Sequence, residues 1–259
     1  MTDTTLPAEA DAEQTTPGSR LSPRDESRLS YASTTYLLAA KALDQVPVVS
    51  DPAPGDLLRS ALDLLRRAEQ VVQSAVIAER ERGTTWEQIG AAAGTTRQSA
   101  HERWYDDVRV WSVTGRSELP AGSPKDSLQT AAELDSLFSV LVPERTDAVT
   151  SGLDAVRFPG SQEYEASLRT RSAALRSRLD VLRRRSSELA EDHSRAVTAG
   201  DSAAVAVTAT SRATCEQEIA DLYRQLAPAE PSLAEEHLHE AKGHEEEAEV
   251  YRRIAEQHA

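Results

Sequence analysis

The sequence predicts an all-α protein with an N-terminal helix-turn-helix domain and a C-terminal helical hairpin that resembles a coiled coil. Two observations support this class. Aromatic residues, which strands favour, make up only 4% of the 259 residues, whereas alanine, leucine, arginine and glutamate dominate. Apolar residues also recur at spacings of three, four and seven, as on one face of a helix. The length suits one large domain or two modest ones.

Composition also restricts the compartment and the class of partner. Cys215 is the only cysteine, which excludes an internal disulfide and a cysteine-based zinc site. No apolar run approaches the roughly 20 residues of a membrane span, and the polar N-terminus lacks the blocks of a secretory signal. We therefore expect a soluble, cytoplasmic protein. The net charge of -14 argues against indiscriminate coating of nucleic acid but leaves room for one small DNA-binding face.

The N-terminal part begins with a polar segment, residues 1–28, that is expected to be a disordered tail. A first helix is predicted over 29–44, and the proline-rich run VPVVSDPAPGD ends it. A strongly amphipathic helix follows over 56–82 and ends at Gly83. The residues on its apolar face are Leu58, Leu62, Leu65, Val72 and Val76.

The C-terminal part reads as long helices separated by turns. A linker with a short helix is expected over 116–160, and an antiparallel hairpin over 161–228. The hairpin turns at Ala199-Gly200-Asp201, and its second helix is expected to end before Pro228. An acidic helical tail over 229–259 completes the chain.

The run from Gly83 to Trp104 meets each physical requirement of a helix-turn-helix, so the domain is placed at 29–115. Thr85 and Gln88 can form a capping box, and Gly94 suits the left-handed turn between two helices. The first helix is expected to turn Trp86, Ile89 and Ala93 toward the core, and the small residues Gly90 and Ala91 are expected to let the second helix cross closely. The second helix is expected to be anchored to the core by Ala100 and Trp104. Its cap is expected to be Thr95 or Thr96.

The second helix of this motif, residues 96–105, carries the candidate DNA-reading side chains. Arg97 and Gln98 fall in its first turn, which usually enters the major groove, where arginine can pair with guanine and glutamine with adenine. Capping hydroxyls suit phosphate contacts. The candidate DNA-binding residues are Thr85, Thr95, Thr96, Arg97, Gln98, Ser99, His101 and Arg103.

The run WEQIGAAAGTTRQSAHERW resembles the helix-turn-helix of actinobacterial regulators, in which W-x-x-I-G-x-A-x-G precedes S-R-Q-A-A-x-x-R-[FW]. The resemblance covers about residues 84–104. This chain departs from the pattern at two positions: Thr95 stands where an aliphatic residue is usual, and Thr96 stands in place of serine. It implies sequence-specific binding of double-stranded DNA, as by a transcriptional regulator. Because one recognition helix rarely suffices, a homodimer on two half-sites is expected. The alternatives are a coiled-coil interaction or scaffold protein with a structural helix-turn-helix, and a plasmid maintenance or segregation factor.

A leucine seam with arginines along both borders runs through the first hairpin helix. The segment 157–185 carries eight arginines against three acids, and 186–259 carries sixteen acids against six bases. The seam can pack inside an antiparallel hairpin, join two copies of the chain, or place arginines on a DNA backbone. The acidic tail can lie over the basic seam or over the DNA-reading face and compete with DNA. The candidate oligomerisation residues are Leu168, Leu175, Leu179, Leu182 and Leu189.

Signatures of catalysis and cofactor binding are missing from the sequence. It contains no P-loop, dinucleotide fingerprint or G-x-S-x-G, and no nucleophile is spaced to use His101 as a base. Four histidines in the acidic tail, His237, His239, His244 and His258, have no recognised metal-site spacing. We therefore expect no enzymatic activity, no cofactor and no metal.

Overall fold

The computed structural model describes residues 21–115, 126–158 and 160–259, and every regular element in these ranges is helical, which confirms the all-α class. Residues 1–20 of the expected tail and 116–125 of the expected linker lie outside this description. None of the described helices is both long and apolar enough to cross a membrane. The elements are α1 (Pro23–Leu43), α2 (Asp56–Glu81), α3 (Trp86–Ala92), α4 (Arg97–Thr114), α5 (Ser127–Leu141), η1 (Thr150–Gly152), α6 (Asp154–Arg157), α7 (Ser161–Ala199), α8 (Ser202–Ala229), η2 (Pro231–Leu233) and α9 (Ala234–His258).

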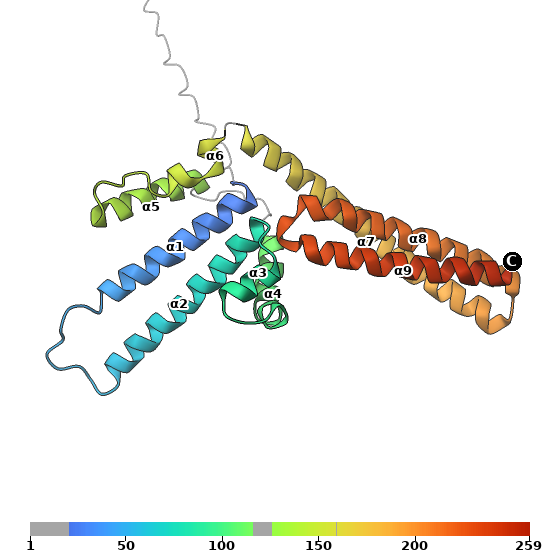
Figure 1. The fold of residues 1–259 in the computed structure, drawn as a ribbon, viewed down its shortest axis with the longest axis horizontal. Coiled ribbons are helices and arrows are strands. Elements are labelled where there is room, and N and C mark those ends of the chain that lie inside the picture. The colour runs from blue at the N-terminus through green and yellow to red at the C-terminus, as the bar shows by residue number, and fades with distance from the viewer. Residues whose placement is uncertain (1–20, 116–125, 159) are drawn as a thin grey trace, which may run out of the picture.

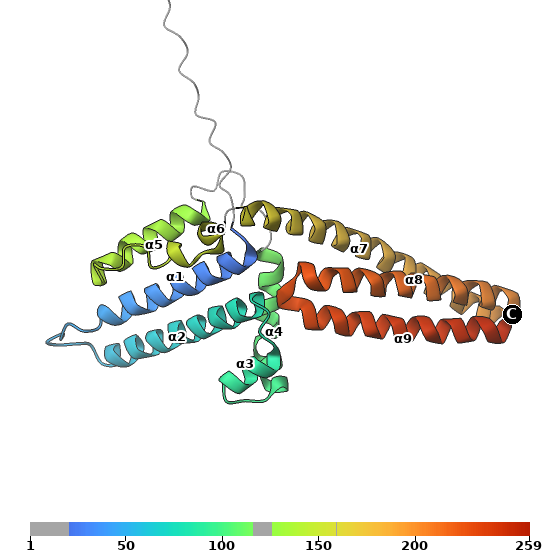
Figure 2. The same ribbon diagram turned by 45° about the horizontal axis from the view of Figure 1, so that its top comes forward.

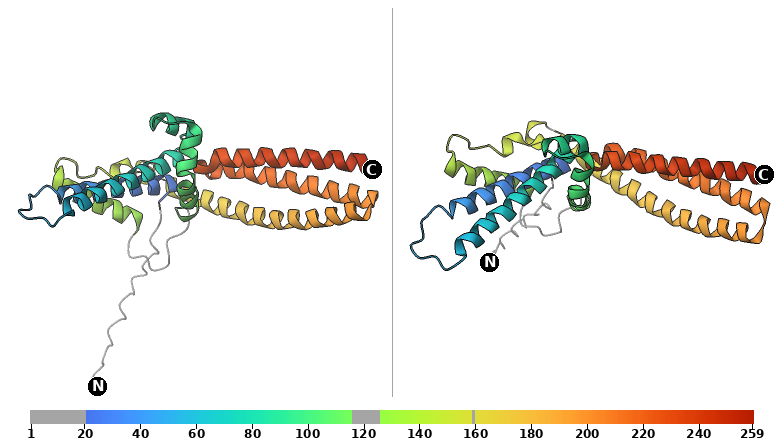
Figure 3. Two further views of the ribbon diagram at one scale, coloured as in Figure 1. Left: turned by 90° about the horizontal axis from the view of Figure 1, so that it is seen from below. Right: turned by 60° about the horizontal axis from the view of Figure 1, so that its bottom comes forward.

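The helices form two elongated arms that meet near the middle of the molecule (Figures 1 and 2). In one arm α1 packs along α2 on one side and against α5 on another. In the other arm α8 packs against both α7 and α9. The short helices α3 and α4 lie at the junction and project from it (Figure 3).

Helix α1 begins at Pro23, six residues before the expected start, so residues 23–28 do not belong to a disordered tail. The Ser22 hydroxyl accepts a hydrogen bond from the Asp25 amide at 3.0 Å, and Pro23 occupies the first helical position. The Asp25 carboxylate also accepts from the Asp154 and Ala155 amides, at 3.0 and 2.9 Å. The start of α1 is therefore fixed by the segment that leads into α6.

The turn between α7 and α8 lies at the expected residues. Gly200 has a φ of 68°, and the Asp201 carboxylate caps α8 by accepting from the Ala204 amide at 3.0 Å. Pro228 does not end α8, contrary to expectation. The helix continues to Ala229, and the Glu230 amide still bonds to the Leu226 carbonyl at 2.9 Å.

The leucine seam of α7 packs inside the chain. Leu175 and Leu179 are buried in a cluster with residues of α8 and α9, and Leu182 and Leu189 pack against that cluster. Leu168, nearer the start of α7, is half-buried. This is the intramolecular packing considered above, and it buries Leu175 and Leu179 within the chain.

Two of the arginines beside this seam bond to residues in or directly after α8. The Arg176 guanidinium donates to both carboxylate oxygens of the buried Glu230, at 2.6 Å each, and Arg183 donates to the Tyr223 hydroxyl. Burial alone would raise the pKa of Glu230, but hydrogen bonds from His237, Arg176 and Ser172 hold it at about 2. A buried charged cluster thus joins α7 to the end of α8.

Candidate nucleic-acid interface

The approach to α3 is set by two local devices that the sequence predicts. Gly83, with a φ of 88°, turns the chain at the end of α2. The Thr85 hydroxyl then accepts from the Gln88 amide at 3.2 Å, while the Gln88 side chain accepts from the Thr85 amide at 2.9 Å. The expected capping box is therefore confirmed.

The turn from α3 to α4 follows the predicted residues as well. Gly94 has a φ of 68°, its amide bonds to the Ala91 carbonyl at 3.2 Å, and the Thr95 amide bonds to the Gly90 carbonyl at 2.8 Å. Thr96, rather than Thr95, caps α4, because its hydroxyl accepts from the Ser99 amide at 3.1 Å. These bonds fix the direction in which α4 leaves the turn.

Gly90 allows the two helices to approach closely. A methyl group built at Gly90 would lie 2.9 Å from the carbonyl carbon and oxygen of Thr96 and 3.1 Å from the Arg97 amide nitrogen. These are backbone atoms at the start of α4, so a side chain at residue 90 would force α4 away. The expectation that a small residue is needed at this crossing is confirmed.

The core between α2, α3 and α4 holds most of the anchors expected. Trp86, Ile89, Ala100 and Trp104 are buried together. Ala93 is exposed, contrary to expectation, because α3 ends at Ala92 and the next residue of the pattern falls in the turn. The same cluster contains Val76, Val108 and Leu233, so the start of the C-terminal arm completes it.

Most of the candidate DNA-binding residues are exposed to solvent. All five residues from Thr95 to Ser99 are exposed, and so is Arg103, whose guanidinium lies 5.0 Å from the centre of the Trp104 ring. Gln98 donates to Glu102 at 2.8 Å on the outer side of α4. Thr85 is half-buried. The turn and the first turn of α4 therefore present polar groups to solvent.

Arg97 and His101 face the first turn of α9. The Arg97 guanidinium, whose side chain is 63% exposed, lies 3.7 Å from Glu235, and the His101 imidazole lies 3.8 Å from Glu236. His101 also stacks on Tyr105 with ring centres 4.6 Å apart, so it is only partly exposed. It follows Ala100 on the helix and therefore borders the buried face. The first turn of α9 therefore lies beside these candidate residues, whereas Glu230, just before it in the acidic tail, pairs with Arg176 of the basic seam.

Arg80, near the end of α2, links this motif to the C-terminal arm and was missed by the sequence reasoning. Its buried guanidinium donates to the Ser232 carbonyl at 3.1 Å, the Thr84 carbonyl at 2.9 Å and Glu236 at 3.1 Å. Glu236 also accepts from the Trp86 indole at 2.6 Å. An arginine in the last turn of a helix is ordinarily exposed to solvent, where its charge interacts favourably with the helix dipole. The sequence around Arg80 therefore gives no sign of this buried contact.

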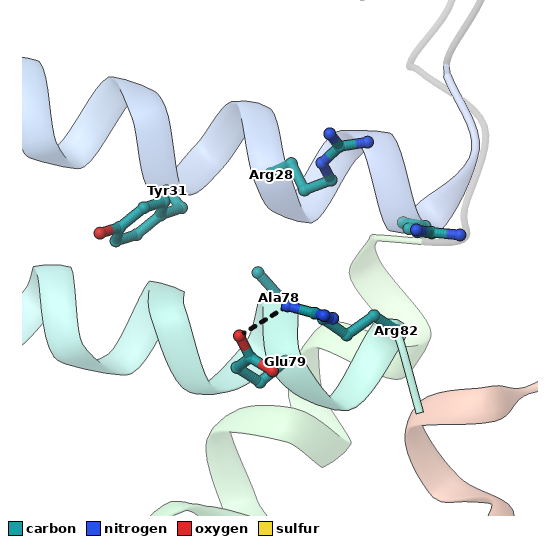
Figure 4. A pocket seen from close by; sticks show the side chains of 6 residues that line it. Arg28, Tyr31, Ala78, Glu79 and Arg82 are labelled. Atoms are coloured by element: carbon teal, nitrogen blue, oxygen red, sulfur yellow. Dashed lines mark hydrogen bonds and ion pairs between the residues drawn. The ribbon is translucent and has the colours of Figure 1, made fainter. Parts of the chain in front are cut away.

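A cavity of about 350 Å³ opens between α1 and α2, beside the entry to the motif (Figure 4). Three arginines line it together with Tyr31, Ala78 and Glu79. Each arginine is paired with a carboxylate of the chain: Arg82 with Glu79 at 3.2 Å, Arg28 with Asp25 at 3.1 Å, and Arg24 with Asp154 at 3.4 Å. The positive charge of this cavity is therefore largely neutralised.

One of the tail histidines belongs to a group with possible metal ligands. Atoms of Glu216, His244 and Glu247 lie within 4.8 Å of one another. His244 bonds to Glu216 at 2.7 Å, and this hydrogen bond raises the pKa of His244, which favours the protonated ring. Glu247 pairs with Arg212 at 3.3 Å. The arrangement favours ion pairs between α8 and α9, because a metal would require the neutral imidazole.

No protein family model, curated protein or solved structure matches this chain. The surface around Thr95–Ser99 combines a backbone fixed by turn hydrogen bonds and a close approach at Gly90 with five exposed side chains.

Proposed function

We propose that this protein binds double-stranded DNA in a sequence-specific manner and acts as a transcriptional regulator. The observation that carries the proposal is the α3–α4 pair. Two caps, a left-handed glycine and a close approach at Gly90 hold the first turn of α4 in one direction, and that turn is exposed. A rigid helix start with accessible polar side chains is what major-groove reading requires.

The residues of this turn suit distinct contacts with DNA. Gln98 is placed on the outer side of α4, where its amide could pair with adenine after leaving Glu102. Arg97 could pair with guanine after leaving Glu235, an exposed pair that costs little to break. The hydroxyls of Thr95, Thr96 and Ser99 suit phosphate oxygens. Binding by one copy is expected to be weak, because segment 56–115 carries eight arginines against nine acids.

The test is selection of bound sequences from random double-stranded DNA at a fixed 100 mM salt, followed by affinity measurement on the selected site. Replacing Arg97 and Gln98 together by alanine should weaken binding by at least about 30-fold, because each base contact is worth roughly 1–3 kcal/mol. The matched control replaces Arg224 and Gln225, an adjacent exposed pair on α8, and should leave affinity unchanged. Failure to enrich any sequence would refute the proposal.

A second candidate is a helical interaction or scaffold protein in which α3 and α4 are structural. It is favoured by one observation, the packing of Arg97 and His101 against the start of α9. This candidate predicts no enriched DNA, and loss of a protein partner in the same double variant. The selection experiment therefore separates the two.

A further inference from the structure

The apolar face of α2 is open to solvent over most of its length. Leu58, Leu62, Leu65 and Val72 lie within an arc of about 80° around the helix. Their side chains are 64%, 47%, 56% and 47% exposed, respectively. The strong amphipathic pattern of this helix would ordinarily indicate a face packed in the core. Here that face has no partner among the described residues.

The open face points away from the rest of its arm. Ser74, which bonds to Thr34 of α1 at 3.2 Å, follows Leu65 by nine residues, about half a turn around the helix axis. The packing between α1 and α2 therefore uses the opposite side of α2. We call the face formed by Leu58, Leu62, Leu65, Glu69 and Val72 the α2 seam.

The α2 seam continues a buried core. Val76, which follows Val72 by one turn on the same face, is buried with Trp86, Ile89 and Trp104. The apolar stripe thus leaves the core of the α3–α4 motif and runs out along α2 without a break in its spacing. A helix that covered the seam would lie directly beside the α3–α4 pair, which is the proposed reading head.

We propose that the α2 seam binds the same seam of a second copy of this chain, with the two helices antiparallel. The seam follows a heptad pattern of Leu58, Leu62, Leu65, Glu69 and Val72, in which Glu69 is the one charged member. Because a two-fold axis relates the two helices, each flank of one helix faces the same flank of the other. Small residues, Ala61 and Ala68, line one flank and permit a close approach.

Arg66, on the other flank, and Glu69, within the seam, carry charges that are complementary between two antiparallel copies. Arg66 and Glu69 are three residues apart on α2. Glu69 makes no ion pair with any residue of the described ranges, and Arg66 contacts only Asp63, at 3.2 Å with its side chain 70% exposed. In an antiparallel pair centred near Ala68, Glu69 of each copy comes level with Arg66 of the other, which gives two reciprocal ion pairs. This match favours a second copy over an unrelated helix.

The size of the seam also fits a weak to moderate dimer. Its four half-exposed aliphatic side chains present an apolar patch on the order of 400 Å², comparable with the largest patch of a typical monomer. Two such patches with their flanking arginine stems would bury roughly 1,000 Å², the lower bound for a biological interface. The inference also extends the proposed function, since two reading heads could then engage two half-sites.

The experiment measures the oligomeric state of the full chain without DNA, by sedimentation equilibrium across a concentration series. The wild type should form dimers. Leu65→Ser should weaken the dimer by at least about 30-fold, as for a central contact residue. Val207→Ser, at an exposed valine on α8, is the matched control and should dimerise normally. Circular dichroism verifies that each variant keeps its helix content.

Charge reversal tests the antiparallel arrangement. Arg66→Glu and Glu69→Arg should each dimerise poorly alone, because each creates like-charge contacts. When the two variants are mixed in equal amounts they should form a heterodimer, since every reciprocal pair then has opposite charges. A wild type that stays monomeric, a Leu65→Ser variant that dimerises normally, or a mixture that remains monomeric would overturn the proposal. The Arg97 and Gln98 double variant should still dimerise, so failed DNA binding and failed dimerisation are distinguishable.

Discussion

Replacing Gly90 by alanine tests whether the close approach of α3 and α4 sets the structure of the proposed site. The added methyl would lie 2.9 Å from two backbone atoms of Thr96, well inside the separation of about 3.5–4.0 Å that non-bonded carbons prefer. Overpacking of this kind costs roughly 1–3 kcal/mol. Alanine gains about 1 kcal/mol in helix propensity. Because backbone atoms must move, we take the upper part of the overpacking range, about 2–3 kcal/mol, and expect a net loss of about 1–2 kcal/mol.

Tryptophan fluorescence during urea unfolding measures this loss locally, because all three tryptophans, Trp86, Trp104 and Trp111, belong to α3 and α4. The control is Gly243→Ala in α9, where the added methyl meets no atom within 4 Å. That change should stabilise the protein by about 0.5–1 kcal/mol. The two substitutions should therefore differ in sign. A Gly90→Ala protein as stable as the wild type would refute the close-approach reasoning.

Three further outcomes follow from ion pairs. Glu235→Gln should release Arg97 and tighten DNA binding about two- to five-fold at low salt, as measured by fluorescence anisotropy. Equal affinities of the variant and the wild type would show that this ion pair does not compete with DNA. Glu230 has a pKa of about 2, below its usual value, so its stabilising effect is present above about pH 4.5 and is lost as the pH falls toward 2. The free energy of unfolding, measured against pH, should therefore fall less in acid for Glu230→Gln than for the wild type. The pKa of His244 is raised by its hydrogen bond to Glu216, so the contribution of this pair to the free energy of unfolding is complete below pH 6.5 and is lost as the pH rises above it. A His244→Gln variant in which the free energy of unfolding falls with rising pH as steeply as in the wild type would contradict this.

Local patterns predicted the parts of the candidate site that depend on neighbouring residues. The cap at Thr85, the turn at Gly94 and the anchors Ala100 and Trp104 each require particular residue types at fixed spacing, and the structure has all of them. The same reasoning failed at Ala93 because periodicity gives no helix end to within one residue.

The missed features depend on contacts between distant segments. Arg80 and Glu236 are 156 residues apart, and the residues next to each of them in the sequence do not indicate that the two side chains pair. The face of α2 that looked like core is exposed in the single chain, since amphipathicity shows that a face needs cover but not which chain supplies it. The α7 leucines had two plausible partners, and the adjacent α8 covers them.

The contact between Arg80 and the start of α9 has a consequence for the order in which the protein is made. Arg80 leaves the ribosome 152 residues before Ser232, its carbonyl partner. Helix α4 ends at Thr114, 119 residues before Leu233, which completes the core of the α3–α4 motif. At about 5–20 residues per second, the motif would exist for roughly 6–24 seconds without that residue. During synthesis α3 and α4 are therefore made well before Glu235 and Glu236, the acids that lie beside them.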